Sequence, residues 1–234
     1  MPHPTAAPRE PIVLSWSGGK DSSLALAALR DDPRVEVVGL LTSVTRGYER
    51  ISIHGVRRAL LDAQVRALTL PLYEIVLEPD CSNDGYDAAL ARTLGALRRR
   101  EPNVRRIAYG DLFLDDVRRY REDQLARLDF AGLFPLWGRP TGMLAREFID
   151  RGFEARLVCV DTTQLDGRFA GRAFDHALLD ELPDSVDPCG ERGEFHTFVS
   201  AGPGFGQQIS YRVGEVVLRD DRFAFCDLED CVNR

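Results

Sequence analysis

The sequence predicts an α/β fold in which a Rossmann-like parallel sheet with crossover helices is followed by a smaller mixed α/β half that ends in a hairpin. Two observations support this prediction. Short runs rich in β-branched residues alternate with helical patterns over the first two thirds of the chain, which is typical of parallel strands joined by helices. From Gly193 onward the pattern is mostly that of strands.

The alternation predicts five strands, at 12–15, 35–42, 72–77, 106–109 and 155–160. Helices are expected between them. The apolar residues of two of these helices recur at helical spacing and are interpreted as core-facing stripes: Leu61, Val65 and Leu68 in one, and Tyr86, Leu90, Leu94 and Leu97 in the other.

The pattern changes after Phe130, so we expect a domain boundary near this residue. A helix is predicted near 141–151, and two strands at 213–218 and 223–228 form a hairpin around Asp220-Asp221. The expected organisation is a disordered tail at 1–10, an N-terminal domain at 11–130 and a C-terminal domain at 131–234.

The composition of the chain excludes several classes of protein. The 234 residues are 44% apolar and carry a formal net charge of -7, which argues against general nucleic-acid binding. No apolar run approaches the ~18 to 20 residues of a membrane span, and residues 1–10 lack the features of a signal peptide. Five cysteines without a C-x-x-C pair favour reduced thiols, so we expect a cytoplasmic protein. The excess of arginine and alanine is typical of a GC-rich bacterial genome.

The strongest functional signal is Ser15-Trp16-Ser17-Gly18-Gly19-Lys20-Asp21-Ser22, where the first predicted strand turns into the first helix. Glycines let the backbone approach an anion closely, and a helix N-terminus presents unpaired N–H groups. Lys20 is the only lysine among 30 basic residues, so an ammonium is expected to matter there. The alternative, a plain turn capped by Asp21 or Ser22, leaves this lysine unexplained. A Walker loop is disfavoured because Asp21 follows Lys20.

The run Ser17 to Ser22 resembles the PP-loop, Ser-Gly-Gly-x-Asp-Ser, of the ATP pyrophosphatases. These enzymes belong to the HUP-type nucleotide-binding proteins. The resemblance implies that the loop holds the β and γ phosphates of ATP while an acceptor oxygen attacks the α phosphate and pyrophosphate leaves. The residues that would bind the nucleotide are Ser15, Ser17, Gly18, Gly19, Lys20, Asp21 and Ser22, with Gly110 and Asp111 further along the chain.

A second block, Gly190-Glu191-Arg192-Gly193-Glu194-Phe195-His196-Thr197, looks like the Gly-Glu-x-Gly-Glu-x-x-Thr segment of the diphthine ammonia ligase family. Segments between the two blocks follow the order of that family: Tyr109 to Phe113, Arg119 to Glu122, and Pro135 to Trp137. The resemblance runs from about residue 11 to 228 and identifies the chain as a member, in the bacterial branch. It implies that 11–130 binds nucleotide and that 131–234 completes the substrate site.

The two acids of the second block have several chemical uses. Glu191 and Glu194 could orient ammonia, accept its proton, or bind a cationic group or Mg2+, with Thr197 further along the same strand. A solvated acidic turn is the plain alternative. Lys20, Glu191, Glu194 and Thr197 are the expected catalytic residues.

Metal and substrate candidates complete the expected site. Asp111 follows a parallel strand at the edge where such sheets bind ligands, so it is a candidate for a metal or ribose, and Asp21 is the second candidate for Mg2+. The substrate-binding candidates are His54, Arg121, Glu122, Trp137 and His196. Each has a plainer alternative: a charged helix face for Arg121 and Glu122, core packing for Trp137, and packing or solvent exposure for His196.

The resemblance implies an enzyme that uses Mg-ATP to adenylate a carboxylate and lets ammonia displace AMP, giving an amide. Its partners would be ATP, ammonia and a carboxylate acceptor, with no nucleic acid and no membrane, and a homodimer is left open. Two alternatives remain: amide chemistry on a corrinoid side chain, an association of the bacterial branch, and a non-catalytic ATP or AMP sensor. Sulfur transfer through Cys189 is disfavoured because no partner cysteine is suitably placed.

Overall fold

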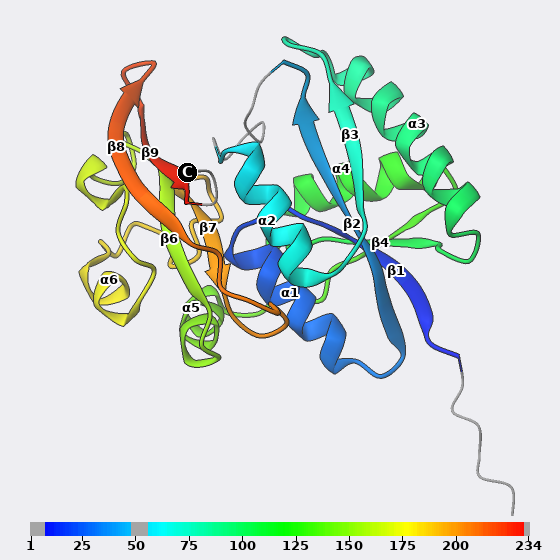
Figure 1. Ribbon diagram of the computed structural model, residues 1–234, viewed down its shortest axis with the longest axis horizontal. Coiled ribbons are helices and arrows are strands. Elements are labelled where there is room, and N and C mark those ends of the chain that lie inside the picture. Colours follow the sequence, from blue (N-terminus) through cyan, green and yellow to red (C-terminus); the bar gives the residue numbers. More distant parts are fainter. Residues whose placement is uncertain (1–7, 48–55, 232–234) are drawn as a thin grey trace, which may run out of the picture.

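The computed structural model describes residues 8–47 and 56–231, and these form two sheets (Figure 1). The first sheet is parallel, with strand order β3-β2-β1-β4-β5. Its strands are β1 (Glu10–Ser15), β2 (Val35–Thr45), β3 (Leu72–Leu77), β4 (Arg106–Ala108) and β5 (Ala131–Leu133). The predicted Rossmann-like α/β class is confirmed.

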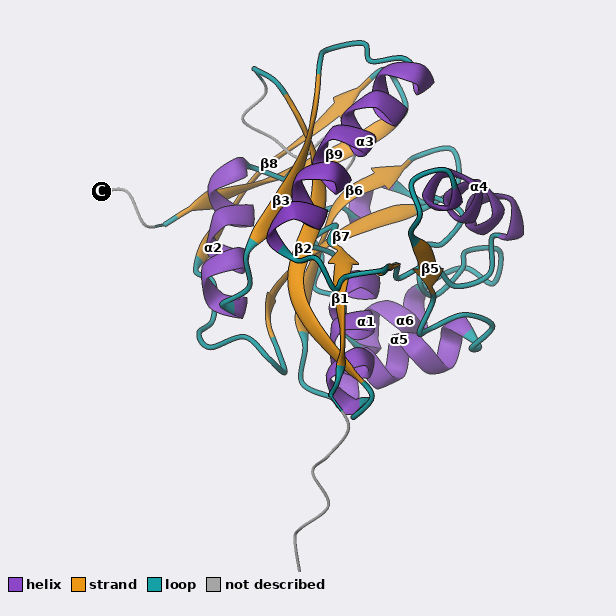
Figure 2. Cartoon of the chain, turned by 90° about the vertical axis from the view of Figure 1, so that its right-hand side faces the viewer, coloured by secondary structure: helices purple, strands orange, loops and turns teal. Residues whose placement is uncertain are grey.

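Helices cover both faces of this sheet, which Figure 2 shows with α3 and α4 toward the viewer and α1 behind. The helices are α1 (Lys20–Asp31), α2 (Arg58–Leu68), α3 (Asn83–Arg100) and α4 (Asp115–Ala126). Because side chains of a strand alternate, Ile12 and Leu14 of β1 pack with α1 and α2, whereas Val13 packs with α3 and α4. The two predicted apolar stripes, on α2 and α3, therefore pack against opposite faces of the parallel sheet.

The second sheet is antiparallel, with order β7-β6-β9-β8. Its strands are β6 (Glu154–Asp161), β7 (Phe195–Ala201), β8 (Tyr211–Arg219) and β9 (Phe223–Asp230), accompanied by α5 (Thr141–Asp150), η1 (Gly167–Phe169) and α6 (His176–Glu181). The predicted hairpin is β8 and β9, and its turn residues Asp220 and Asp221 have positive φ of 51° and 47°. Such a turn matches the twist of the flanking strands.

One predicted strand forms, but in a different sheet from the one that the alternation predicted. The strand expected at 155–160 forms as β6, but it belongs to the antiparallel sheet. The fifth parallel strand is β5, whose Ala-Gly-Leu sequence has no β-branched residue and gave no strand signal. Since β5 pairs with β4, the parallel sheet extends just past the boundary expected at residue 130.

The two sheets share one apolar core, with α1 and α2 between them in Figure 1. The cluster joins Leu14 of β1 and Leu60 of α2 to Leu157 of β6 and Phe198 of β7. The C-terminal strands therefore pack directly against the helix that follows the glycine-rich loop. None of the helices in the described part of the chain is long and apolar enough to cross a bilayer.

Candidate active site

The glycine-rich loop joins β1 to α1 and leaves the start of the helix open. Gly18 has φ of +78°, and a Cβ there would lie 2.7 Å from Oε1 of Gln64, so only glycine fits. The N-cap of α1 is Gly19, which supplies no side-chain cap. The hydroxyls of Ser22 and Ser23 donate to the Gly19 carbonyl, each at 3.0 Å. Since no side chain of Gly19 covers the first turn, its later amides, those of Asp21 and Ser22, are available for an anionic ligand.

Lys20 is buried, with only 4% of its surface exposed, and its Nζ donates to both carboxylate oxygens of Asp21 at 2.9 and 2.8 Å. The rings of Phe174 and Phe195 lie 6.0 and 5.6 Å from Nζ. Burial acts to lower the pKa of Lys20, but the carboxylates of Asp21 and Glu191 outweigh it and raise that pKa. The ammonium is therefore charged at neutral pH.

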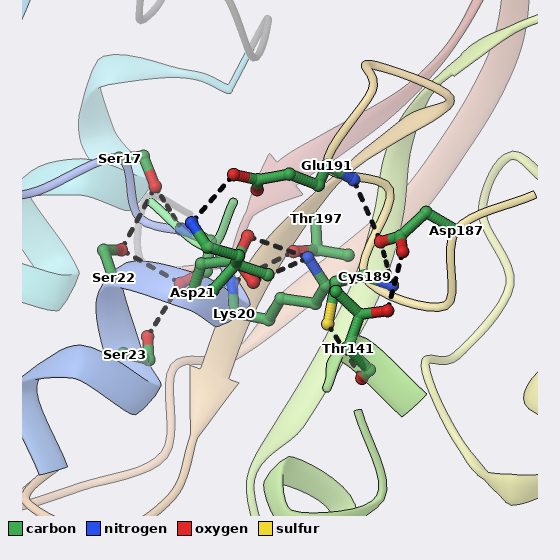
Figure 3. Close-up of polar contacts among 12 residues, drawn as sticks. Ser17, Lys20, Asp21, Ser22, Ser23, Thr141, Asp187, Cys189, Glu191 and Thr197 are labelled. Atoms are coloured by element: carbon green, nitrogen blue, oxygen red, sulfur yellow. Dashed lines mark hydrogen bonds and ion pairs between the residues drawn. The ribbon is translucent and has the colours of Figure 1, made fainter. Parts of the chain in front are cut away.

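The C-terminal half closes over this loop (Figure 3). Oγ1 of Thr197 accepts the backbone N–H of Lys20 at 3.0 Å, and the backbone N–H of Val199 donates to the Gly18 carbonyl at 2.9 Å. Both residues belong to β7. The strand predicted to carry candidate site residues thus contacts the loop directly.

Gly110 and Asp111 follow β4 and lie against the start of α1. A Cβ on Gly110 would come within 2.8 Å of the Asp21 carbonyl carbon, so a larger residue would displace the helix start. Asp111 accepts two hydrogen bonds from Arg121, at 2.6 and 3.2 Å. The guanidinium of Arg121 also lies 4.4 Å from the centre of the Tyr109 ring. These contacts fix Arg121 in one orientation.

The loop 187–194 brings the acids of the second block to the site. Oδ1 of Asp187 accepts the N–H groups of Cys189 and Glu191 at 2.9 and 3.3 Å. The carboxylate of Glu194, 1% exposed, accepts the N–H groups of Asp187 and Arg192, both at 2.9 Å. This loop is therefore held by its own carboxylates.

Glu191 is the acid that faces the glycine-rich loop, and its Oε1 accepts the N–H of Leu112 at 2.8 Å. Burial, with the charges of Asp21 and Asp111, raises the pKa of Glu191 to about 7. A carboxyl group with this pKa can take up and release a proton near neutral pH. Burial and the charge of Lys20 lower the pKa of His196 to about 4, so its imidazole is neutral.

Two cavities meet here. The first, which we call the loop cavity, has a volume of about 260 Å3, and its polar lining residues include Ser17, Lys20, Asp21, Asp111, Arg121, Glu191, His196 and Thr197. The second, the strand-end cavity, has a volume of about 420 Å3 at the carboxyl ends of β1, β2 and β3, and its lining includes Ser15, Trp16, Thr42, Ser43, Tyr86 and Tyr120. Ser17 and Arg121 line both cavities, which therefore adjoin.

Several predicted residues lie away from these cavities. Glu194 is turned into its own loop, as described above. Glu122 pairs with Arg118 at 2.8 Å, and Trp137 packs against the same arginine, 4.7 Å from ring centre to guanidinium. Neither Glu122 nor Trp137 lines the loop cavity or the strand-end cavity. His54 lies outside the described residues.

Gln64 of α2 is a site residue that our sequence analysis missed. It is completely buried; its Oε1 accepts the indole N–H of Trp16 at 3.0 Å, and its Nε2 donates to the carbonyls of Gly18 and Val199 at 2.9 and 2.7 Å. It joins the glycine-rich loop to β7. A signal was present, because Gln64 occupies a core-facing position between Leu61 and Leu68 of the apolar stripe.

The described residues offer few candidate ligands for a metal ion. Within residues 8–47 and 56–231, no group of three or more His, Cys, Asp or Glu side chains is arranged to hold a metal ion. Asp21 and Asp111 both line the loop cavity. One or two carboxylates completed by phosphate oxygens and water are the usual ligands of Mg2+ in nucleotide sites, so this pair fits that ion when a nucleotide is bound.

Comparison with known proteins identifies the family. The model of the diphthamide synthase N-terminal domain matches residues 10–128, and that of the diphthamide synthase C-terminal domain matches residues 140–232. The chain belongs to the diphthamide synthase family. This confirms the resemblance to diphthine ammonia ligases drawn from the two sequence blocks.

Similar proteins include ligases from vertebrates. The chain is 29% identical to diphthine–ammonia ligase of Homo sapiens and 28% identical to that of Rattus norvegicus, covering 89% of this chain and 85% of each relative. The enzyme of the same name from Danio rerio is 29% identical, with 91% of both chains covered. The protein is accordingly an enzyme of the ligase class, as the sequence predicted.

Proposed function

We propose that this protein is an ATP-dependent ligase that adenylates a carboxylate and then forms an amide from it with ammonia, releasing pyrophosphate and AMP. One observation carries the proposal: Lys20 of the glycine-rich loop and Glu191 of the C-terminal half line a single cavity. This arrangement brings a cation suited to phosphate and a carboxyl group suited to proton transfer into reach of one substrate.

The nucleotide spans both cavities in this proposal. The adenosine occupies the strand-end cavity, at the carboxyl edge where parallel sheets bind ligands. Its phosphates extend past Ser17 to the N-terminus of α1, whose amides and positive dipole end favour anions. The adjoining lining at Ser17 and Arg121 supports one continuous path for ATP.

Lys20 stabilises the leaving pyrophosphate. With ATP bound, its ammonium exchanges the Asp21 carboxylate for phosphate oxygens. Asp21 would then be free to hold Mg2+ together with Asp111, whose carboxylate oxygens have further lone pairs beside those that accept from Arg121, and the ion would supply charge neutralisation at the phosphates. Gly110 supports this step by leaving room for the helix start beside Asp111.

The chemistry proceeds in two steps. An oxygen of the acceptor carboxylate attacks the α phosphorus, the bond to the bridging oxygen breaks, and pyrophosphate leaves with an acyl adenylate formed. Ammonia then attacks the acyl carbon and AMP leaves. Glu191 takes the proton that the nitrogen must lose, for which a pKa of about 7 is suited. Thr197 keeps the loop in place, and Glu194 positions Glu191 by holding the loop 187–194.

The acceptor is a carboxylate bound beside Arg121, the fixed guanidinium that lines both cavities. His196 contributes a neutral imidazole to the same wall, and His54, Glu122 and Trp137 stay predictions for the outer part of the acceptor site. The relatives are named for diphthine, and a corrinoid acid is the second acceptor to test. Both cavities are lined by residues of one chain, so this proposal does not require the homodimer that the sequence left open. All five cysteines are free, which supports the cytoplasm as the place of this activity.

The test is product analysis with Mg-ATP, ammonium and a panel of carboxylic acids that includes diphthine peptides and corrinoid acids. We expect AMP, pyrophosphate and amide in equal amounts with one acid. When that acid carries 18O in its carboxylate, mass spectrometry should find one labelled oxygen in AMP. Lys20→Ala is the inactive control, and Arg34→Ala, an exposed residue outside both cavities, is its matched partner. ADP and phosphate as products, or ATP binding without turnover on any acid, would contradict the proposal, and the latter would favour a sensor.

A further inference from the structure

The outer edge of the antiparallel sheet carries an apolar strand. Among the residues that the structure describes, β8 pairs with β9 alone, and it forms the edge at the left of Figure 1. Four of its aliphatic side chains are about half exposed: Val213 at 43%, Val216 at 50%, Val217 at 47% and Leu218 at 54%. An edge strand of this kind presents free backbone N–H and C=O groups and invites pairing with another strand.

The sides on which these residues lie are set by the pairing with β9. Val216 and Leu218 lie opposite the buried residues Cys226 and Ala224, so they point toward the core side of the sheet. Val217 and Arg219 lie opposite Phe225 and Phe223 and point to the other side. The register shifts between Val213 and Val216, so the regular pairing covers 216–219, and Glu215 lies directly beside its first residue.

Two opposite charges flank the exposed aliphatic residues. Glu215 and Arg219 are both exposed, and neither has an ion-pair partner among the residues that the structure describes. By contrast, Arg212 on the same strand pairs with Glu229 of β9. The segment 215–219 therefore has an acidic residue, three aliphatic residues and a basic residue in order, a sequence that is complementary to itself in the antiparallel direction.

We propose that β8 pairs with β8 of a second copy of this chain, antiparallel about a two-fold axis at Val217. Glu215 then lies opposite Arg219 of the partner subunit, and Val216 lies opposite Leu218 of the partner subunit. Charge favours this register over two others. An axis at Glu215 would place two glutamates together, and an axis at Leu218 would place Glu215 opposite Asp221 of the partner subunit. The two sheets become one continuous sheet across the dimer.

Sedimentation equilibrium on the full chain tests the pairing. We expect a dimer for the wild type. Glu215→Arg and Arg219→Glu should each raise the dimer Kd about tenfold or more, because two attractive cross-strand pairs become repulsive. The double variant Glu215→Arg/Arg219→Glu restores opposite charges and should return Kd to within about threefold of the wild type. Restoration of this kind is not expected from a loss of folding.

A matched charge reversal checks the register. Arg212→Glu lies on the same strand but outside 215–219, so it should leave the dimer Kd unchanged. The thermal unfolding of every variant, followed by circular dichroism, should stay within a few degrees of the wild type because these side chains are exposed. A monomeric wild type, a double variant no tighter than the single ones, or an Arg212→Glu variant as weak as Arg219→Glu would overturn the proposal.

Discussion

The two loops that meet at the candidate active site differ in what stabilises them. The glycine-rich loop, residues 16–23, depends strongly on distant residues: Thr197 accepts an N–H at its end, and Gln64 and Val199 both contact its Gly18. The loop 187–194 has more bonds of its own, through the carboxylates of Asp187 and Glu194, although Thr141 also donates to Asp187 from outside it. The comparison teaches that the glycine-rich loop is sensitive to changes far away in the sequence, whereas the loop 187–194 is sensitive chiefly to changes within its own eight residues.

The largest expected effect is on Lys20, the charge that the glycine-rich loop presents. Lys20→Ala should reduce AMP formation about 10² to 10³-fold, the cost of losing one strong donor to the transition state. The initial rate at saturating ATP measures it, with Arg34→Ala expected to retain wild-type turnover. A Lys20→Ala enzyme within threefold of wild type would remove this loop from the chemistry.

The second-largest expected effect concerns Glu191, in the loop 187–194. Glu191→Gln should reduce turnover roughly 10²-fold, because the amide keeps the hydrogen bond to Leu112 but cannot accept a proton. In the wild type, turnover should rise with pH through about 7 as Glu191 loses its proton, and this limb should vanish in the variant. A pH profile unchanged by the substitution would assign the proton to another group.

The free energy of unfolding gives a second test of Glu191, because the substitution that lowers turnover should not lower stability. Because the folded pKa of about 7 lies above the usual 4.5, the folded state binds more protons between these values, and the free energy of unfolding decreases as pH rises through that range. Glu191→Gln has no charge to bury, so urea unfolding at pH 8 should show a variant at least as stable as the wild type. A destabilised Glu191→Gln would indicate a structural residue.

Gln64 tests the dependence of the glycine-rich loop on distant residues. Gln64→Leu removes partners from the Trp16 indole and from two buried carbonyls, and should lower the free energy of unfolding by about 3 kcal/mol. Urea unfolding checks it, beside Gln208→Leu, an exposed glutamine for which a change within about 0.5 kcal/mol is expected. If both variants are equally stable, β7 does not hold the loop through this amide.

The smallest effect separates the two acids of the loop 187–194. Glu194→Gln keeps one acceptor oxygen but turns an NH2 group toward either the Asp187 or the Arg192 amide, so about 1 to 2 kcal/mol of stability should be lost. Turnover at 25 °C should fall less than in Glu191→Gln. If turnover falls further than in Glu191→Gln, Glu194 has a direct part in the chemistry.

The same contrast explains what the sequence could predict. The parallel sheet and the glycine-rich loop are local patterns, so their positions could be read from residues 10–23 and from the apolar stripes. β5 could not, because three residues of Ala-Gly-Leu form a strand only through pairing with β4. The orientations of Glu191 and Glu194 differ although both follow a glycine, since each is decided by which amide it reaches in the folded chain.

The bond between Lys20 and Thr197 joins residues 177 positions apart. During synthesis on the ribosome, the glycine-rich loop emerges early but lacks its acceptor until β7 has been made. A nascent chain therefore carries the glycine-rich loop before Glu191, His196 and Thr197, which line the rest of the loop cavity, have been joined to it. If the proposed function holds, a product truncated before β7 is expected to lack ligase activity.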